Sequence, residues 1–208
     1  MSDVETWRRR GQAARLAHET VNRAFREHVR ERDPDRYAAL LEDFWTKTAA
    51  ALPSTDPEFL AGLASGRDAR VVPEARKRSI ETAIVFLEAD PWFFRSGYEK
   101  QKIIQHLKRS RLTERQRMRL ARVVLAVIDG LAGGEREKSQ AGGEREGPAE
   151  GGRENGHRIE FRHYGRLACG IWSDFLDEEV AARMQSRDAG VRRRATWVAA
   201  AAISAGKA

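Results

Sequence analysis

The histidines are the residues of this chain that most directly suggest metal chemistry, but their spacing does not build a site. His18 and His28 are ten residues apart in a helical segment, which separates them by about 15 Å along that helix, too far to share a metal ion. Glu160 and His163 are three residues apart, the spacing at which a carboxylate and an imidazole on one helix face share a metal ion. Such a centre needs a second pair of this kind and two further inward glutamates, and none can be placed in this sequence. We therefore predict no metal site and no cofactor.

Paired carboxylates are the other candidates for chemistry, and their positions favour structural roles. Acid–base catalysis needs two carboxyl groups held in a cleft with separated pKa values. Here the pair Glu42 and Asp43, and the run from Asp177 to Glu179, fall at predicted helix starts or on polar faces. Carboxylates in such places complement the helix dipole or pair with arginine. We predict no catalytic residue, and an enzyme without a linear motif stays open as an alternative.

The segment 90–102 has the most unusual composition, with three aromatic residues after a proline and then a helix that carries lysines. Exposed rings in this segment would stack on a partner while the cations hold its charge. Alternatively, the rings close the core between two helix pairs, and we expect Trp92 and one phenylalanine to do so. The candidate surface contacts are Arg95, Tyr98 and Lys102.

Basic residues gather in two further clusters. The first basic cluster is Lys108, Arg109, Arg111 and Arg115, and the second basic cluster is Arg192, Arg193 and Arg194. The chain has 38 Lys and Arg against 31 Asp and Glu, a formal net charge of +7. If the turns of successive helix pairs line one edge, the two clusters share a surface suited to the phosphates of DNA or RNA. Because 33% of the residues are charged, however, most of these side chains must cover solvated helix faces.

Capping chemistry and apolar spacing predict helices along most of the chain. Asp33 and Asp56 each precede a proline at a first helical position, and Thr113 with Gln116 forms a capping-box pattern. Apolar residues between these boundaries recur at intervals of three and four, so we predict an all-α fold in which Trp197 packs in the core. The expected helices are 4–31, 34–52, 57–65, 74–88, 97–109, 114–131, 158–172, 174–185 and 189–204.

Residues 132–157 break this pattern. They repeat Gly-Gly-Glu-Arg or Gly-Gly-Arg-Glu units every nine residues and contain no aromatic or β-branched side chain. Such a composition buries too little apolar surface to offset its chain entropy, which predicts a flexible loop. We therefore expect a helical region at 1–131, this loop, and C-terminal helices at 158–208 that pack on the first region as one domain.

The last predicted helix carries the one motif with a family resemblance. Asp188 stands as an acidic cap, Val191 and Arg192 follow after a short gap, and Ala195 comes three residues later. This pattern resembles the second helix of a HEAT-type repeat, and the resemblance implies antiparallel helical hairpins in a short solenoid. Because no regular repeat is visible in the first 90 residues, a compact helical domain is the alternative architecture.

The sequence favours a binding protein. Repeat proteins of the HEAT and armadillo type mostly bind proteins, so the resemblance implies a scaffold or adaptor without catalytic activity; the alternative is a basic helical module that binds the DNA or RNA backbone. Cys169 is the only cysteine, and the charged N-terminal residues precede no apolar segment, so we expect a cytoplasmic protein. Its use of Arg over Lys, with much Ala and Gly, is typical of a GC-rich bacterial genome.

Overall fold

The computed structural model describes residues 3–64, 73–130 and 150–207, and all secondary structure in these ranges is helical. This confirms the predicted all-α fold. No described helix is long and apolar enough to cross a membrane. The helices are α1 (Val4–Arg26), α2 (Val29–Arg32), α3 (Pro34–Ala51), the short 3-10 helix η1 (Pro53–Thr55), α4 (Pro57–Ala64), α5 (Pro73–Ala89), α6 (Ser96–Leu107), α7 (Glu114–Ile128), α8 (Glu150–Ile171), α9 (Asp174–Met184) and α10 (Ala189–Ser204).

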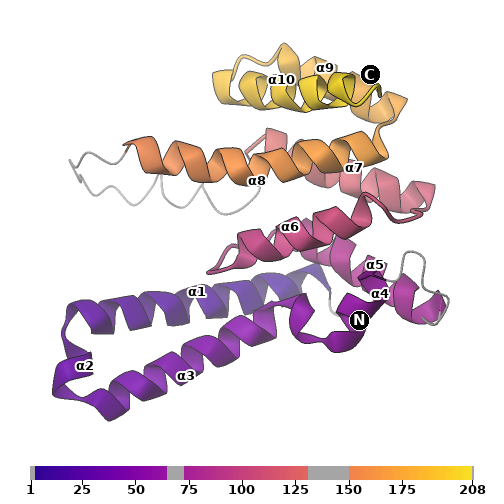
Figure 1. The fold of residues 1–208 in the computed structure, drawn as a ribbon. Coiled ribbons are helices and arrows are strands. Elements are labelled where there is room, and N and C mark those ends of the chain that lie inside the picture. Colours follow the sequence, from indigo (N-terminus) through magenta and orange to yellow (C-terminus); the bar gives the residue numbers. More distant parts are fainter. Residues whose placement is uncertain (1–2, 65–72, 131–149, 208) are drawn as a thin grey trace. The chain divides into compact units, whose positions relative to one another are not determined.

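The chain forms two compact units, Met1–Lys100 and Gln101–Ala208, called unit 1 and unit 2 below. Unit 1 is built on a long hairpin in which α1 and α3 lie side by side, with α2 between them in the chain (Figure 1). Helices α4 and α5 form a second pair, and α5 also packs on α1, where the rings of Trp7 and Phe86 meet edge to face at 5.4 Å. The expectation of a single domain stays a prediction.

The predicted helix 4–31 is wrong in one respect, because it is interrupted before its end. Helix α1 stops at Arg26, and His28 adopts a left-handed conformation with φ of 56° before α2 begins. The His28 backbone N–H donates to the Phe25 carbonyl at 3.1 Å, so the break is closed by a local hydrogen bond. A left-handed residue often ends a helix, but it is usually glycine, and this histidine gave no such signal.

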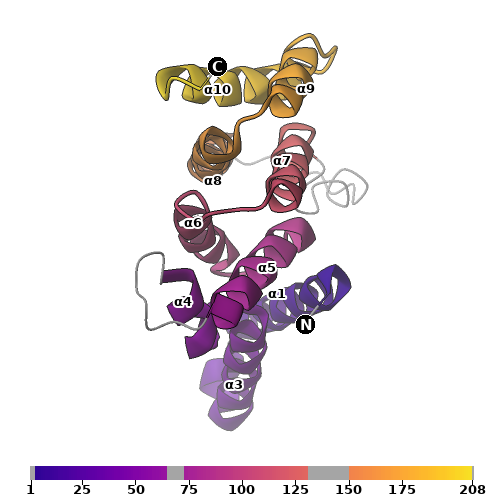
Figure 2. The same cartoon turned by 90° about the vertical axis from the view of Figure 1, so that its right-hand side faces the viewer.

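Unit 2 places its helices in two layers. Helices α7 and α9 lie in one layer and α8 and α10 in the other (Figure 2), with contacts both within and between the layers. Helix α7 contacts α8, α9 and α10, and its Leu120, Val124 and Ile128 are fully buried. Its β-branched pair Val123 and Val124 lies in helix, and the predicted capping box of Thr113 and Gln116 is present.

Three further expectations for unit 2 are corrected. Helix α8 begins at Glu150 rather than at residue 158, so the last part of the predicted loop is helical, while residues 132–149 lie outside the described residues. Helix α7 ends at Ile128 rather than at 131, because Gly130 takes a φ of 72° just beyond it. Trp197 is 39% exposed instead of lying in the core. The centroid of its ring lies 5.8 Å from that of the Phe161 ring.

Candidate interaction surfaces

A group of rings on unit 1, in which Trp45 and Phe94 are exposed over the buried Phe44, forms the first candidate surface. We define the aromatic surface as His18 of α1, Phe44 and Trp45 of α3, and Phe94 and Arg95 of the segment before α6. The centroid of the His18 ring lies 5.2 Å from the centroids of both the Phe44 and the Phe94 ring. The centroids of the Phe44 and Trp45 rings are 4.7 Å apart. The Arg95 guanidinium lies 5.4 Å from the Trp45 ring and 5.5 Å from the Phe94 ring, distances at which a cation is attracted to the face of a ring.

The segment before α6 presents this surface because its residues alternate between core and solvent. Phe93 is buried beside Ala14 of α1 and Ala51 of α3. Its neighbours in the chain point outward, with Phe94 41% and Trp92 51% exposed. The expectation that one phenylalanine is core is therefore confirmed, whereas the expectation for Trp92 is wrong.

The residues just after this segment divide between surface and structure. Tyr98 is 72% exposed, and Lys102 is exposed one turn later. Lys100 is only 2% exposed, and its Nζ forms an ion pair with Asp90 Oδ1 at 2.7 Å. Glu99 is also buried and accepts hydrogen bonds from the backbone N–H and the hydroxyl of Ser54, both at 2.7 Å. The first turns of α6 therefore anchor the chain as well as offering Tyr98 to a partner.

Two arginines of the second basic cluster form hydrogen bonds within unit 2. Arg192 Nη1 donates to the carbonyls of Ser186 and Arg187 at 2.7 and 2.9 Å, which holds the turn before α10. Arg194 Nε donates to the carbonyl of Ile128 at 2.7 Å and so satisfies the last turn of α7. Arg193 is exposed, and its guanidinium lies 5.9 Å from the Trp197 ring. The cluster predicted from its charge serves mainly to fix helix ends.

The first basic cluster lies elsewhere in unit 2 and is exposed. Arg109, Arg111 and Arg115 are exposed around the turn between α6 and α7, and Lys108 is half-buried there. Arg115 stands in the first turn of α7, whereas Arg194 binds the last residue of that helix. A helix rises 1.5 Å per residue, so the two clusters are separated by about 20 Å along α7. The structure therefore does not bring them together in one groove.

Two exposed arginines of α8, Arg162 and Arg166, extend the first basic cluster, and the charge pattern of the sequence did not predict this. Gly170 of α8 approaches the turn so closely that a Cβ built on it would lie 3.3 Å from Lys108 Cα. Arg166 and Arg162 stand about one and two turns before Gly170 on the same side of α8, and both are exposed. The i, i+4 spacing of the two arginines was the available signal, but only the glycine contact shows which other cluster they lie beside.

A cleft of about 440 Å³ opens on unit 1 among α1, η1, α4 and α5. Two cations, Arg10 and Arg78, and two carboxylates, Asp56 and Glu58, line this cleft. The Ser79 hydroxyl at its wall donates to the carbonyl of Ala75 at 3.0 Å, and Asp56 accepts the Glu58 backbone N–H at 2.9 Å. The polar groups with described contacts in this cleft therefore support the local backbone.

Cys169 is held as a protonated thiol. Its Sγ donates a hydrogen bond to the Gly165 carbonyl at 3.2 Å, and burial raises the pKa of this thiol above its ordinary value. A thiol in this state is a poor nucleophile near neutral pH, because the thiolate is the reactive form. Among the residues that the structure describes, no three His, Cys, Asp or Glu side chains gather as metal ligands.

Comparison of this chain with protein-family models, curated proteins and solved structures finds no match.

Proposed function

We propose that this chain is a helical scaffold or adaptor that binds a protein partner and carries out no reaction itself. The observation that carries the proposal is the exposure of the aromatic surface, where Trp45 is 46% and Phe94 is 41% exposed while Arg95 lies over both rings. Tryptophan and arginine are enriched among the residues that contribute most to binding at protein interfaces. Their close grouping on one surface supports a protein-binding role.

The charge of Arg95 indicates the chemistry of the partner. None of the described carboxylates forms an ion pair with Arg95. A partner that covered this guanidinium without pairing it would bury an unpaired charge, which costs free energy. The proposed partner is therefore a protein segment that places apolar side chains on Trp45 and Phe94 and an aspartate or glutamate beside Arg95.

We also propose that unit 2 is a HEAT-like pair of helical hairpins. The alternation of its helices between two layers supports this. So do the motif residues, since Asp188 accepts a hydrogen bond from the Val191 backbone N–H at 2.9 Å and Ala195 is fully buried. A cytoplasmic setting belongs to the same proposal, because a chain with one cysteine forms no disulfide within itself.

Peptide selection tests the protein-binding proposal. The full chain would be immobilised and used to select from a displayed library of random peptides about 16 residues long, and the dissociation constants of the selected peptides measured by fluorescence anisotropy. We expect selected peptides to combine aromatic or leucine residues with a nearby carboxylate. Trp45→Ala and Phe94→Ala should each weaken binding about tenfold or more, the effect of losing a central interface residue.

Two variants make the test specific. Arg95→Glu should abolish binding of an acidic peptide, and exchanging the peptide's acidic residue for lysine should restore it. Trp197→Ala removes a partly exposed tryptophan of unit 2 and should leave the dissociation constant unchanged. Failure to select any peptide, or equal binding by all of these variants, would overturn the proposal.

A further inference from the structure

The net positive charge of the chain belongs entirely to its second half. Residues 1–100 contain 17 Lys and Arg and 17 Asp and Glu, whereas residues 101–208 contain 21 Lys and Arg against 14 Asp and Glu. The division falls where unit 1 ends and unit 2 begins. Unit 1, which presents the aromatic surface, has no net charge. The protein-binding role proposed for that surface therefore does not account for the net positive charge of unit 2.

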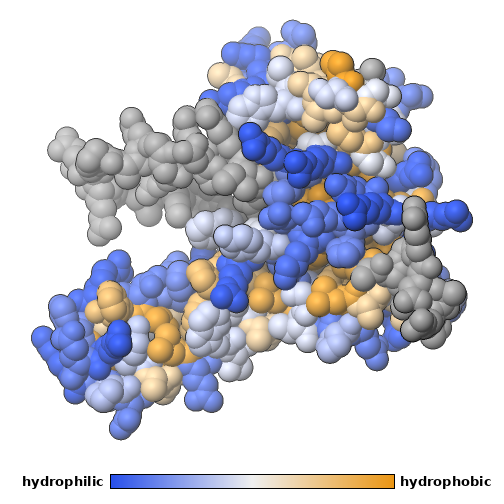
Figure 3. All heavy atoms as spheres, in the orientation of Figure 1, coloured by the Kyte–Doolittle hydropathy of each residue, from blue (hydrophilic) through white to orange (hydrophobic). Residues whose placement is uncertain are grey.

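Five cations of unit 2 lie together, although they come from segments far apart in the sequence. We define the basic strip as Lys108, Arg109, Arg111, Arg162 and Arg166. The close approach of Gly170 to the backbone of Lys108, at 3.3 Å for a Cβ built on the glycine, brings α8 against the turn after α6. Arg166 and Arg162 continue the strip from that contact for about 12 Å along α8. Figure 3 shows strongly hydrophilic side chains gathered over this part of unit 2.

The charges of the basic strip are available to a ligand. All four arginines are exposed, and none of the five cations forms an ion pair with a described carboxylate. The second basic cluster provides the contrast within the same unit, because two of its three arginines are hydrogen-bonded to backbone carbonyls. Unpaired arginines in a row favour a ligand with repeated anionic groups, since guanidinium matches phosphate with two parallel hydrogen bonds.

We propose that the basic strip binds the phosphodiester backbone of a nucleic-acid duplex. A duplex carries one negative charge per about 1.7 Å of its axis, which gives several phosphates within reach of the strip. Single strands are bound through aromatic stacking, and the strip contains no aromatic residue. Membrane surfaces are bound with apolar anchors, but the large exposed apolar side chains described in unit 2, Trp197 and Ile203, are both on α10.

Salt-dependent binding tests this proposal. A fluorescein-labelled DNA duplex of 20 base pairs, and an RNA duplex of the same sequence, would be titrated with the full chain between 50 and 200 mM salt. Each phosphate contact contributes about −0.9 to the slope of log K against log salt concentration, so five cations predict a slope of about −4.5. Phosphate contacts do not read sequence, so a scrambled duplex should bind equally well. Absence of a slope, or of binding to either duplex at 50 mM salt, would overturn the proposal.

Matched variants separate the strip from the overall charge. Arg162→Glu with Arg166→Glu should weaken binding at least tenfold at 50 mM salt and reduce the magnitude of the slope by about two contacts, whereas Arg162→Lys with Arg166→Lys should retain most of both. Arg9→Glu with Arg36→Glu makes the same change in net charge on exposed residues of unit 1 and should leave binding nearly unchanged. Equal loss in this control, or tighter binding to phosphatidylserine vesicles than to either duplex, would reject the strip as a nucleic-acid site. None of these variants alters the aromatic surface. Failure of the nucleic-acid proposal would therefore not count against the protein-binding proposal, and the reverse also holds.

Discussion

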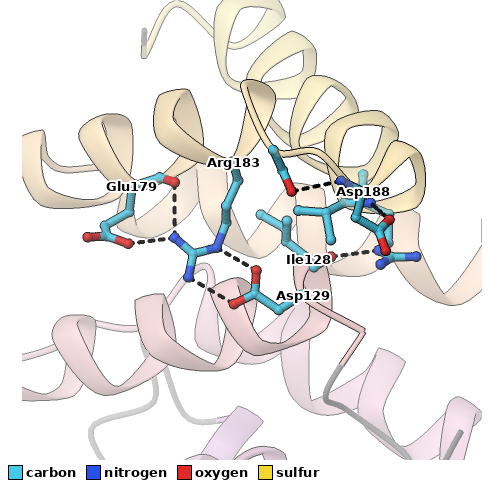
Figure 4. Close-up of polar contacts among 8 residues, drawn as sticks. Ile128, Asp129, Glu179, Arg183 and Asp188 are labelled. Carbon is cyan, nitrogen blue, oxygen red and sulfur yellow. Dashed lines mark hydrogen bonds and ion pairs between the residues drawn. The ribbon is translucent and has the colours of Figure 1, made fainter. Parts of the chain in front are cut away.

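Arg183 of α9 forms two parallel hydrogen bonds with Asp129, the residue that follows α7. Its Nε donates to Asp129 Oδ1 at 2.7 Å and its Nη2 donates to Oδ2 at 2.8 Å (Figure 4), while Nη1 donates to Glu179. The hydrogen bonds to Asp129 are the main cause that raises the pKa of Arg183 above its ordinary value. A planar guanidinium fits this carboxylate as no lysine can, so the contact joins the two helices with a defined geometry.

Replacing this arginine should therefore reduce the stability of unit 2 even when the charge is kept. The Arg183 and Asp129 side chains are 21% and 27% exposed, so this ion pair is neither fully exposed nor fully buried. We expect Arg183→Lys to lower the free energy of unfolding by about 1–2 kcal/mol and Arg183→Met to lower it further. Urea denaturation measures both changes. Lys47→Met, which breaks the exposed pair with Asp43, should cost less than about 0.5 kcal/mol, and an equal cost for both pairs would contradict the expectation.

The N-cap residue of α10, Asp188, should make the stability of the protein depend on pH in the acid range. Hydrogen bonds from the Val191 and Gly190 backbone N–H groups lower the pKa of Asp188 below its ordinary value. Because the folded pKa is lower than the unfolded one, the stabilisation is fully present above about pH 4 and is lost as the pH falls through the folded pKa. Asp188→Asn keeps an acceptor that does not titrate, so its melting temperature should fall less between pH 5 and pH 2 than that of the wild type. Asp188→Ala should melt lower at pH 7, and parallel melting curves for all three proteins across this pH range would refute the assignment.

The helix starts could be predicted because capping acts over three or four residues. Asp33 accepts the Arg36 backbone N–H, Asp188 accepts that of Val191, and Thr113 exchanges hydrogen bonds with Gln116. Each signal lies within one turn of its target, so no knowledge of the tertiary fold is needed. The same locality explains why an all-α fold was clear from the sequence alone.

The roles of the arginines depend on contacts that local sequence does not encode. Arg194 caps a helix whose last residue, Ile128, lies 66 positions earlier in the chain. Arg162 and Arg166 extend the first basic cluster only because Gly170 lets α8 approach Lys108. Both outcomes follow from how the helices pack, and charge along the sequence cannot distinguish an arginine that caps a helix from one that faces solvent.

Two helical glycines should respond in opposite ways to alanine. A Cβ on Gly62 of α4 would lie 2.1 Å from the Ser79 hydroxyl of α5, whereas a Cβ on Gly165 of α8 would meet Ala201 at an ordinary 3.5 Å. Gly62→Ala must displace Ser79 from its hydrogen bond to the Ala75 carbonyl, so we expect a loss of about 1–3 kcal/mol of unfolding free energy. Gly165→Ala should leave stability unchanged or raise it by up to about 1 kcal/mol, because alanine is the better helix former. Thermal and urea denaturation of the two variants would decide this, and a Gly62→Ala protein as stable as the wild type would show that α4 and α5 are not in this close contact.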